Sequence, residues 1–137
     1  MTMTPAEGDR MLADFFAPWV RELGLSVESV GEDRAVLRLP WSDRLARDGG
    51  ALSGQALMAA ADTATVIAVA AARGGYGPMT TVQQSTTFQR AVVGSDVRVE
   101  AVVTKLGRRT AFADITLTTV DSGALAARAS TVYALLG

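Results

Sequence analysis

The sequence has no cysteine and no histidine among its 137 residues. Without cysteine, the chain cannot form a disulfide, and it has no thiol nucleophile and no thiolate ligand for a metal. Without histidine, it has neither a Ser-His-Asp nor a Cys-His arrangement, and no histidine ligand for zinc or iron. Histidine is also the usual general base near neutral pH. If the protein is an enzyme, its chemistry therefore depends on a carboxylate, a hydroxyl group, Lys105 or a backbone dipole.

The net charge is also small, because 13 basic and 14 acidic side chains sum to −1. This balance gives no electrostatic reason to expect binding to nucleic acid or to an anionic membrane, and we expect neither. Arginine supplies 12 of the 13 basic side chains. This bias indicates either anion binding, since guanidinium groups pair well with phosphate, or only the coding bias of a GC-rich genome. No apolar segment follows a basic start at the N-terminus, so we expect no signal peptide and a cytoplasmic protein.

The length fits one domain, and we expect residues 1–8 to be frayed and residues 9–137 to form a single domain. Apolar side chains at three- and four-residue spacing predict a helix over residues 9–23, bent or restarted at Pro18. Runs rich in β-branched residues, separated by turn-forming residues, predict strands elsewhere. The predicted strands are 26–30, 35–39, 80–91, 96–106, 110–120 and 124–135.

The most unusual segment is residues 53–72, which is largely apolar and has Asp62 as its only charged side chain. Ser53 is a suitable N-cap, so the segment predicts a helix that is apolar on nearly all sides. Such a helix lies in a core or spans a membrane, and an Asp at its midpoint among many alanines favours the core. The order of the elements then predicts an α+β fold in which an antiparallel sheet surrounds one long helix.

The sequence LSGQALMAAADTA at residues 52–64 resembles the start of the central helix in hotdog-fold acyl-CoA thioesterases of the PaaI type. Members of that family carry a His-Gly-Gly motif there, with an acidic residue nine positions after the His. Ser53 occupies the His position, and Gly54 and Gln55 occupy the two Gly positions. Asp62 occupies the position of the acid.

The resemblance runs from about residue 9 to the C-terminus and includes an F-x-R segment at 88–90 and an L-G-R-R turn at 106–109. It implies the hotdog fold, an antiparallel sheet wrapped around a long central helix, and hydrolysis of acyl-CoA thioesters. The chain departs from the family at two of the three motif positions and at Arg47, where many relatives have Asn. Orientation of the substrate by the motif His is therefore excluded here.

By this resemblance, Asp62 acts on the thioester carbonyl as a general base or as a nucleophile. The Gly54 N–H is the expected oxyanion donor, because N–H groups at a helix start point outward at the positive end of the helix dipole. The residues themselves leave structural alternatives open. Asp62 would then be a buried carboxylate bonded to backbone or hydroxyl groups, and Gly54 an ordinary helix-start glycine.

Three further side chains are candidates near the reacting carbonyl, each with a structural alternative. Ser53 either only caps the helix or also contacts the substrate. Gln55 either donates its amide to the thioester or to water, or only fills a gap. Thr81 aligns with a position at which some relatives hold a hydroxyl that positions water, although a strand threonine is often only structural.

Arg108 and Arg109 lie in a predicted turn, in a region that family members commonly use to bind CoA, and paired arginines suit its phosphates. A solvated hairpin tip is the alternative. Arg90 is a weaker candidate for the same task. We expect no metal, since cysteine and histidine ligands are absent. We also expect no separate cofactor, because CoA is part of the acyl-CoA substrate.

The resembled family pairs its sheets edge to edge, and its active sites lie between subunits. We therefore expect a homodimer or a homotetramer with shared active sites. The altered motif at residues 53–55 keeps a second function open, that of a non-catalytic acyl-CoA-binding protein of the same fold. A hotdog dehydratase is disfavoured, because those enzymes typically pair a His with an acid. An unrelated structural or interaction module is the remaining alternative.

Overall fold

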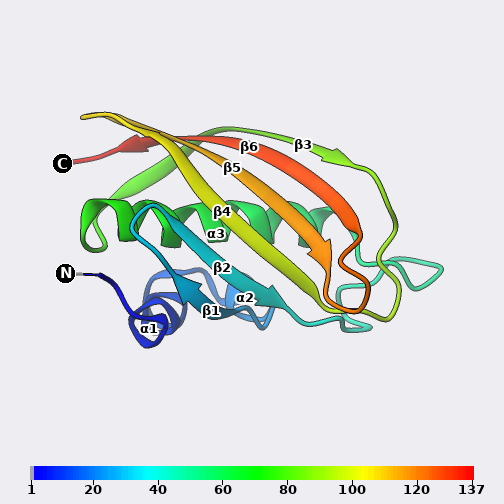
Figure 1. The fold of residues 1–137 in the computed structure, drawn as a ribbon. Coiled ribbons are helices and arrows are strands. Elements are labelled where there is room, and N and C mark those ends of the chain that lie inside the picture. Colours follow the sequence, from blue (N-terminus) through cyan, green and yellow to red (C-terminus); the bar gives the residue numbers. More distant parts are fainter. Residues whose placement is uncertain (1) are drawn as a thin grey trace.

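A curved six-stranded antiparallel sheet surrounds one long helix, as Figure 1 shows for the computed structural model, which describes residues 2–137. The helices are α1 (Pro5–Phe15), α2 (Pro18–Arg21) and α3 (Gly54–Arg73). The strands are β1 (Ser26–Val30), β2 (Arg34–Leu39), β3 (Met79–Phe88), β4 (Val97–Leu106), β5 (Thr110–Thr119) and β6 (Leu125–Leu135). Their order is β1-β2-β4-β5-β6-β3, so β1 and β3 form the two edges of the sheet. The predicted α+β arrangement is confirmed.

Helix α3 fills the concave side of the sheet because its side chains are small and apolar. It begins after the N-cap Ser53 and ends at Gly74, which has the left-handed conformation with φ 83°. Ala60, Ala64 and Ala68 are fully buried, which lets β2 and β4 approach the helix closely. By length and composition α3 could cross a membrane, but 67% of its apolar window is buried inside the fold. It is therefore placed as a core helix.

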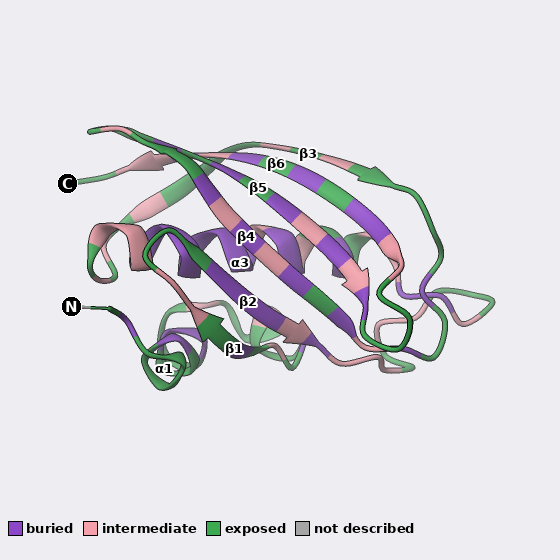
Figure 2. Cartoon of the chain, in the orientation of Figure 1, coloured by how far each residue is buried: buried purple, intermediate pink, exposed green. Residues whose placement is uncertain are grey.

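Strands β4 and β5 alternate between a face toward α3 and a face toward solvent, as predicted. Val97, Val99 and Ala101 of β4 are fully buried, whereas Arg98 and Glu100 lie on the opposite face. Full burial of a valine side chain stabilises a fold by about 1.5–3 kcal/mol. Figure 2 shows buried residues along the central strands and none along β3. The sheet thus covers α3 at its centre and leaves it more open at the β3 edge.

Helix α1 begins four residues earlier than predicted, and the expectation of a frayed segment at residues 1–8 is wrong for residues 5–8. Thr4 and Glu7 form a capping box. The Thr4 hydroxyl accepts from the Glu7 N–H at 3.2 Å, and the Glu7 carboxylate accepts from the Thr4 N–H at 2.9 Å. This box satisfies two N–H groups that the helix start would leave free. Met1 lies outside the described residues.

The helix predicted over residues 9–23 is interrupted, and α2 begins at Pro18, as expected for a residue without an N–H. Strand β3 ends at Phe88, three residues earlier than predicted. Beyond it the chain leaves β6 and reaches the loop that precedes α3. There the Leu52 N–H donates to Val92 O at 2.9 Å. This hydrogen bond between the two loops places the end of β3 against the start of α3.

Candidate active site

Asp62 lies on the face of α3 that the sheet leaves open. This face follows the three- and four-residue spacing of a helix. Most other positions of α3 are buried, whereas the residues of this face are exposed or half-buried. They are Gln55, Met58, Ala59 and Asp62. The carboxylate is therefore the charged group on an otherwise uncharged open face, near the edge strand β3.

Two hydroxyl groups donate hydrogen bonds to the same oxygen of Asp62. Thr81 Oγ1 lies 2.9 Å from Asp62 Oδ1, and Tyr133 Oη lies 2.5 Å from it. Tyr133 Oη also lies 3.0 Å from the backbone carbonyl oxygen of Asp62. None of residues 2–137 donates a hydrogen bond to Asp62 Oδ2. One oxygen of the carboxylate is thus held and the other is left for a ligand or water.

The register of the sheet explains why these two hydroxyls meet. Thr81 of β3 and Tyr133 of β6 are directly opposite each other, so their side chains point toward α3 together. A β-bulge at Val82 then shifts the register by one residue. Because of this extra residue Gln84 also faces α3, and its Nε2 donates to Met58 O at 3.1 Å. The bulge thus gives β3 two polar side chains that contact α3.

Tyr133 is buried, with 3% of its surface exposed. Burial, and next the negative charge of Asp62, raise the pKa of the Tyr133 hydroxyl far above its ordinary value. The phenol therefore stays protonated and acts as a donor toward the carboxylate. The structural alternative for Asp62 required hydroxyl groups bonded to its carboxylate, and these are present. A catalytic role requires a free carboxylate oxygen, and Oδ2 is free of donors from residues 2–137.

At the start of α3, two backbone N–H groups have no acceptor within residues 2–137. Ser53 caps the helix, because its Oγ accepts from the Ala56 N–H at 3.1 Å. The N–H groups of Gly54 and Gln55 make no such bond. A Cβ at Gly54 would lie 3.3 Å from the Phe88 ring, so the absence of a side chain keeps this approach open. These features suit an oxyanion donor.

A cleft of about 420 Å³ opens beside these N–H groups. Its wall includes Gly54, Leu57, Phe88 and two arginines, Arg47 and Arg90. None of the residues that line it is acidic. The positive end of the α3 dipole adds to the two guanidinium charges, so the cleft favours an anion or a polarised carbonyl oxygen.

The structure divides the predicted site residues into two groups, which we call the acid half and the anion half. The acid half consists of Asp62 with its donors Thr81 and Tyr133. The anion half consists of the helix start and its cleft: Ser53, Gly54, Gln55 and Arg90. Eight residues separate Gly54 from Asp62, which is about 12 Å along a helix axis at 1.5 Å per residue. The two halves of one chain therefore do not meet.

Arg108 and Arg109 join neither half within one chain. They are exposed in the turn between β4 and β5, where Leu135 N–H donates to Arg109 O at 2.8 Å. Leu135 pairs with Met79 at the first residue of β3, whereas the anion half lies at the last residue of that strand. A ten-residue strand spans about 30 Å. Figure 1 shows this turn near the C-terminus, at the end of the molecule where α3 ends.

Sequence reasoning missed Tyr133, Gln84 and Phe88. The signal for Tyr133 was its place on the α3-facing side of a strand, two residues after Thr131 on the same buried face. A buried tyrosine needs a partner for its hydroxyl, and Asp62 is the only charged side chain of the segment predicted as the central helix. Asp62 could have been inferred as the partner of a buried tyrosine. The sequence does not indicate which strands lie beside Asp62.

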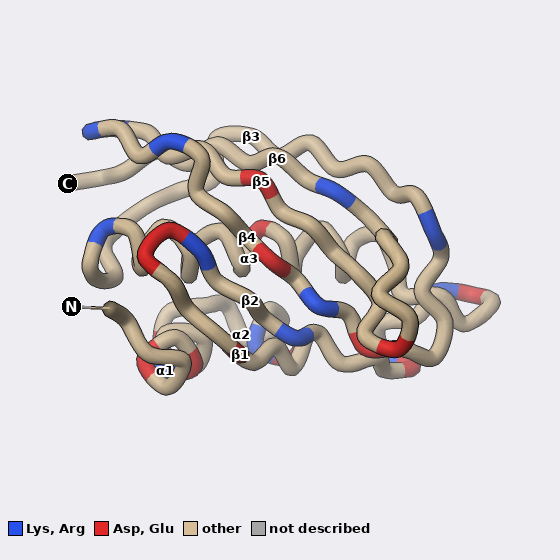
Figure 3. The backbone as a smooth tube through the Cα atoms, viewed as in Figure 1, with Lys and Arg blue, Asp and Glu red and all other residues tan. Residues whose placement is uncertain are grey.

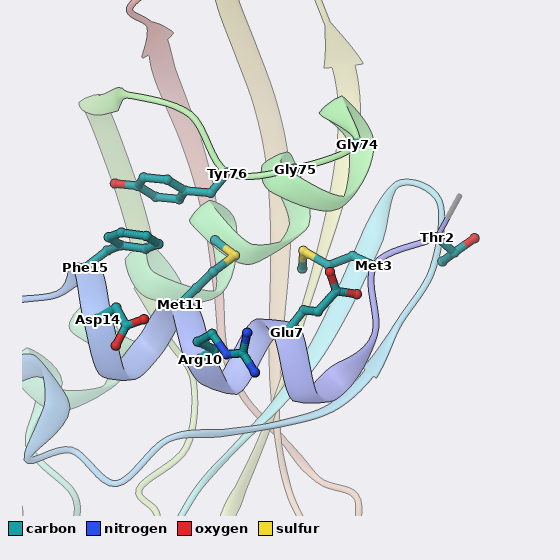
Figure 4. Close-up of a pocket in the computed structure, with 10 residues that line it drawn as sticks. All are labelled: Thr2, Met3, Glu7, Arg10, Met11, Asp14, Phe15, Gly74, Gly75 and Tyr76. Carbon is teal, nitrogen blue, oxygen red and sulfur yellow. The ribbon is translucent and has the colours of Figure 1, made fainter.

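A second cavity, of about 280 Å³, lies between α1 and the loop that follows α3 (Figure 4). The rings of Phe15 and Tyr76 stack along it with centroids 4.2 Å apart. Glu7, Arg10 and Met11 of α1 line another side. This cavity contains none of the residues predicted for the site. Over residues 2–137, no group of three or more acidic side chains is placed to hold a metal ion.

Comparison with known proteins identifies the class to which this fold and site belong. The family model of the thioesterase superfamily matches residues 49–126, more than half of the chain. The chain therefore belongs to the thioesterase superfamily, and the hotdog fold expected from the sequence is confirmed. No curated protein matches the sequence.

Three solved structures illustrate the likeness. A conserved protein from Pseudomonas aeruginosa is 27% identical, with 88% of this chain and 95% of that chain covered and a TM-score of 0.81. The PaaI protein of the E. coli phenylacetic acid degradation operon is 19% identical, with 96% and 92% covered and a TM-score of 0.83. A hypothetical thioesterase from Streptococcus pneumoniae, solved with coenzyme A, is 17% identical, with 82% and 86% covered and a TM-score of 0.75. The last two share the fold.

Proposed function

We propose that the protein hydrolyses an acyl- or aryl-CoA thioester to the free acid and CoA. The observation that carries this proposal is the carboxylate of Asp62, which is held on one oxygen by Thr81 and Tyr133 and open on the other. In a member of the thioesterase superfamily, such a group is suited to activate water at a thioester carbonyl. The solved relative that contains coenzyme A supports CoA as the thiol part of the substrate.

Asp62 and Thr81 together would orient the attacking water. Thr81 donates its only proton to Asp62 Oδ1, so its oxygen can only accept a further hydrogen bond. A water molecule that donates to Asp62 Oδ2 and to Thr81 Oγ1 has both protons engaged and a lone pair left for the carbonyl carbon. This geometry supports a general-base role for Asp62, with direct attack to form a mixed anhydride as the alternative.

The reaction then proceeds through an oxyanion. As the water oxygen bonds to the carbonyl carbon, Asp62 takes the water proton and the Gly54 N–H stabilises the negative charge on the carbonyl oxygen. Collapse of this intermediate breaks the C–S bond, and the proton passes from Asp62 to the departing CoA thiolate. The Gln55 N–H at the same helix start is a second donor to the oxyanion, and its side chain lies exposed beside it.

One chain does not bring Asp62 and Gly54 to the same carbonyl, so we propose that two chains share each site. The edge strand β3 supports this pairing. Its ten residues include no charged residue (Figure 3). They also include no proline, and none of them is buried. Apart from the bulge at Val82, such an edge lacks the charged side chains and the proline that discourage strand pairing. The other edge, β1, is short and covered by α1, where Asp9 Oδ1 accepts from the Val27 N–H at 2.8 Å.

Antiparallel pairing of two β3 strands would place the first residues of one strand beside the last residues of the other. The acid half of one copy would then face the anion half of the second copy. Arg108 and Arg109 would approach the cleft that contains Arg90 of the second copy, where they would bind the CoA phosphates. This arrangement gives a homodimer with two identical sites, from which a homotetramer is built by further contacts.

The altered motif favours one second candidate, a non-catalytic acyl-CoA binder. Its supporting observation is that Ser53, at the position of the motif His, accepts the Ala56 N–H as a helix cap, so the role of the His is not replaced by an equivalent side chain. Incubation with a panel of acyl-CoAs, from short aliphatic to aryl, and measurement of free thiol separates the two candidates. Thiol release that Asp62→Asn abolishes supports the hydrolase. Bound CoA without thiol release supports the binder, and equal rates in both proteins remove Asp62 from the mechanism.

A further inference from the structure

We infer that Tyr133 is a positioning residue for Asp62, and that together with Thr81 it fixes the carboxylate so that Oδ2 is the oxygen that reacts. This inference rests on the proposed hydrolysis and assigns a role to a residue that the family resemblance did not indicate. It concerns a single atom, because the two oxygens of a carboxylate are chemically identical until the protein distinguishes them.

The hydrogen bonds distinguish the two oxygens. A carboxylate oxygen offers about two lone-pair positions. Thr81 and Tyr133 both donate to Oδ1, so its positions are occupied, whereas none of residues 2–137 donates to Oδ2. The terminal torsion of an Asp side chain is broad and roughly two-fold, so an unanchored carboxylate would turn freely. Two donors on one oxygen hold that torsion and keep Oδ2 toward the open face.

Tyr133 is the more rigid of the two donors. Its ring is buried between β6 and α3, and its hydroxyl contacts both the carboxylate and the backbone carbonyl oxygen of Asp62. Thr81 lies on the edge strand and is exposed, although its hydroxyl reaches Asp62. The aromatic side chain therefore fixes the acid relative to the core, and the threonine completes the arrangement from the edge. The raised pKa of the phenol keeps it a donor throughout the working pH range.

The chain offers a matched control for a merely structural role. Thr131, two residues before Tyr133 on β6, shares a buried hydrogen bond of 3.0 Å with Thr65 on α3. Both bonds join the same strand to the same helix through a buried hydroxyl. Thr65 also donates to Ala61 O at 2.9 Å, so it keeps a partner when Thr131 is replaced. Only the Tyr133 bond reaches Asp62.

The test compares Tyr133→Phe with Thr131→Val in acyl-CoA hydrolysis and in thermal unfolding. Both substitutions are expected to lower the melting temperature, because each removes a hydroxyl that joins β6 to α3. Tyr133→Phe is expected to lower kcat by about 10- to 100-fold with KM nearly unchanged, as for partners that orient a reacting ligand. Thr131→Val is expected to keep the wild-type kcat. Equal kcat in the two variants overturns the inference.

Thr81 keeps the inference testable if Tyr133→Phe does not fold. Thr81→Val on the exposed edge removes the second donor, and Thr81→Ser restores a hydroxyl at the same place. The expected result is a loss of kcat in Thr81→Val that Thr81→Ser largely reverses, and a wild-type rate in Thr81→Val overturns the inference. If wild type releases no thiol while binding CoA, the proposed hydrolysis itself fails and this inference falls with it. If Asp62→Asn is inactive while Tyr133→Phe is fully active, only the inference fails.

Discussion

The acid half and the anion half of the candidate site differ in how far one chain completes them. Around Asp62, both donors come from the same chain, and one of them is a buried tyrosine. At the start of α3, the N–H groups of Gly54 and Gln55 meet no acceptor within residues 2–137, and Gly54 lines an open cleft. The acid half is therefore a finished, fixed arrangement. The anion half has donors without an acceptor, and in the proposed reaction a substrate oxygen supplies it.

This difference indicates where each kind of substitution should act. In the acid half, a substitution alters the hydrogen bonds among Asp62, Thr81 and Tyr133, which are already formed without a ligand. We therefore expect such a substitution to change the rate of the chemical step. In the anion half, the N–H groups of Gly54 and Gln55 have no partner within residues 2–137, so the effect of a substitution depends on what binds there. The edge strand β3 connects the two halves, because the acid half lies at its start and the anion half at its end.

Asp62→Asn is expected to have the largest effect. It removes the base and keeps an oxygen that still accepts from Thr81 and Tyr133, so the melting temperature should change little. The rate of thiol release should fall by about 10³- to 10⁴-fold, the upper range for loss of a general base. Steady-state assay with the best acyl-CoA measures the rate, and calorimetry measures the stability. A variant that keeps most of its activity would remove Asp62 from the chemistry.

Gly54→Pro is the corresponding test of the anion half. Position 54 is the first residue of α3, where proline is well tolerated, and Ser53 before it has φ −66° and ψ 149°, which proline also accepts. The substitution deletes the N–H, and we expect kcat to fall by about 10²- to 10³-fold, as for loss of an oxyanion donor.

Gly54→Ala is the matched control for this test. It keeps the N–H and adds only a Cβ 3.3 Å from the Phe88 ring, so it reports the steric part of the change. Kinetic assay of both variants separates the two contributions. If alanine and proline reduce kcat equally, the N–H of Gly54 is not the oxyanion donor.

The central helix and the alternation of β4 were predicted correctly because both depend on local patterns. Ser53 as N-cap and Asp62 as the lone charge follow from spacing within about ten residues. The contact between Asp62 and Tyr133 does not, because it joins residues 71 apart and depends on β6 lying between β5 and β3. The bulge at Val82 was also missed, since a single extra residue breaks the two-residue period of a strand without a sequence signal.

The capping box at Thr4 has a signal in the sequence itself, because T-P-A-E at residues 4–7 matches the motif. Arg108 and Arg109 illustrate a different limit. Their turn was predicted correctly, but their distance from the anion half of the same chain follows from the three-dimensional order of the strands. In the proposed dimer they reach the cleft of a second copy, an arrangement that the residue pattern around the turn does not predict.

Mixing two inactive variants tests whether the halves come from different chains. Co-expressed Asp62→Asn and Gly54→Pro subunits that pair at random form mixed dimers in half of the cases. A mixed dimer with shared sites has one site in which both residues are native, so about a quarter of the wild-type activity should return. Purification through two different tags isolates the mixed dimer. An inactive mixed dimer would mean that each site lies within one chain.

Arginine substitutions are expected to have the smallest effects and to test how CoA spans the two copies. An exposed arginine that pairs with phosphate contributes about 0.2–1 kcal/mol, so Arg90→Ala and the double variant Arg108→Ala/Arg109→Ala should each raise KM by up to about fivefold per arginine, with kcat unchanged. Arg10→Ala, an exposed arginine of α1 outside both halves, is the control and should leave KM unchanged.

The substrate decides how these arginine effects are interpreted. An acyl-pantetheine thioester lacks the nucleotide phosphates of CoA, so it should be hydrolysed by wild type and the arginine variants with the same KM. If Arg90→Ala and the Arg108/Arg109 variant both raise KM for acyl-CoA alone, the β4–β5 turn and the cleft contact one CoA molecule. Because these groups lie about 30 Å apart along β3 in one chain, this result requires a second copy. If only Arg90 has an effect, CoA lies along the anion half and the turn is a solvated hairpin tip.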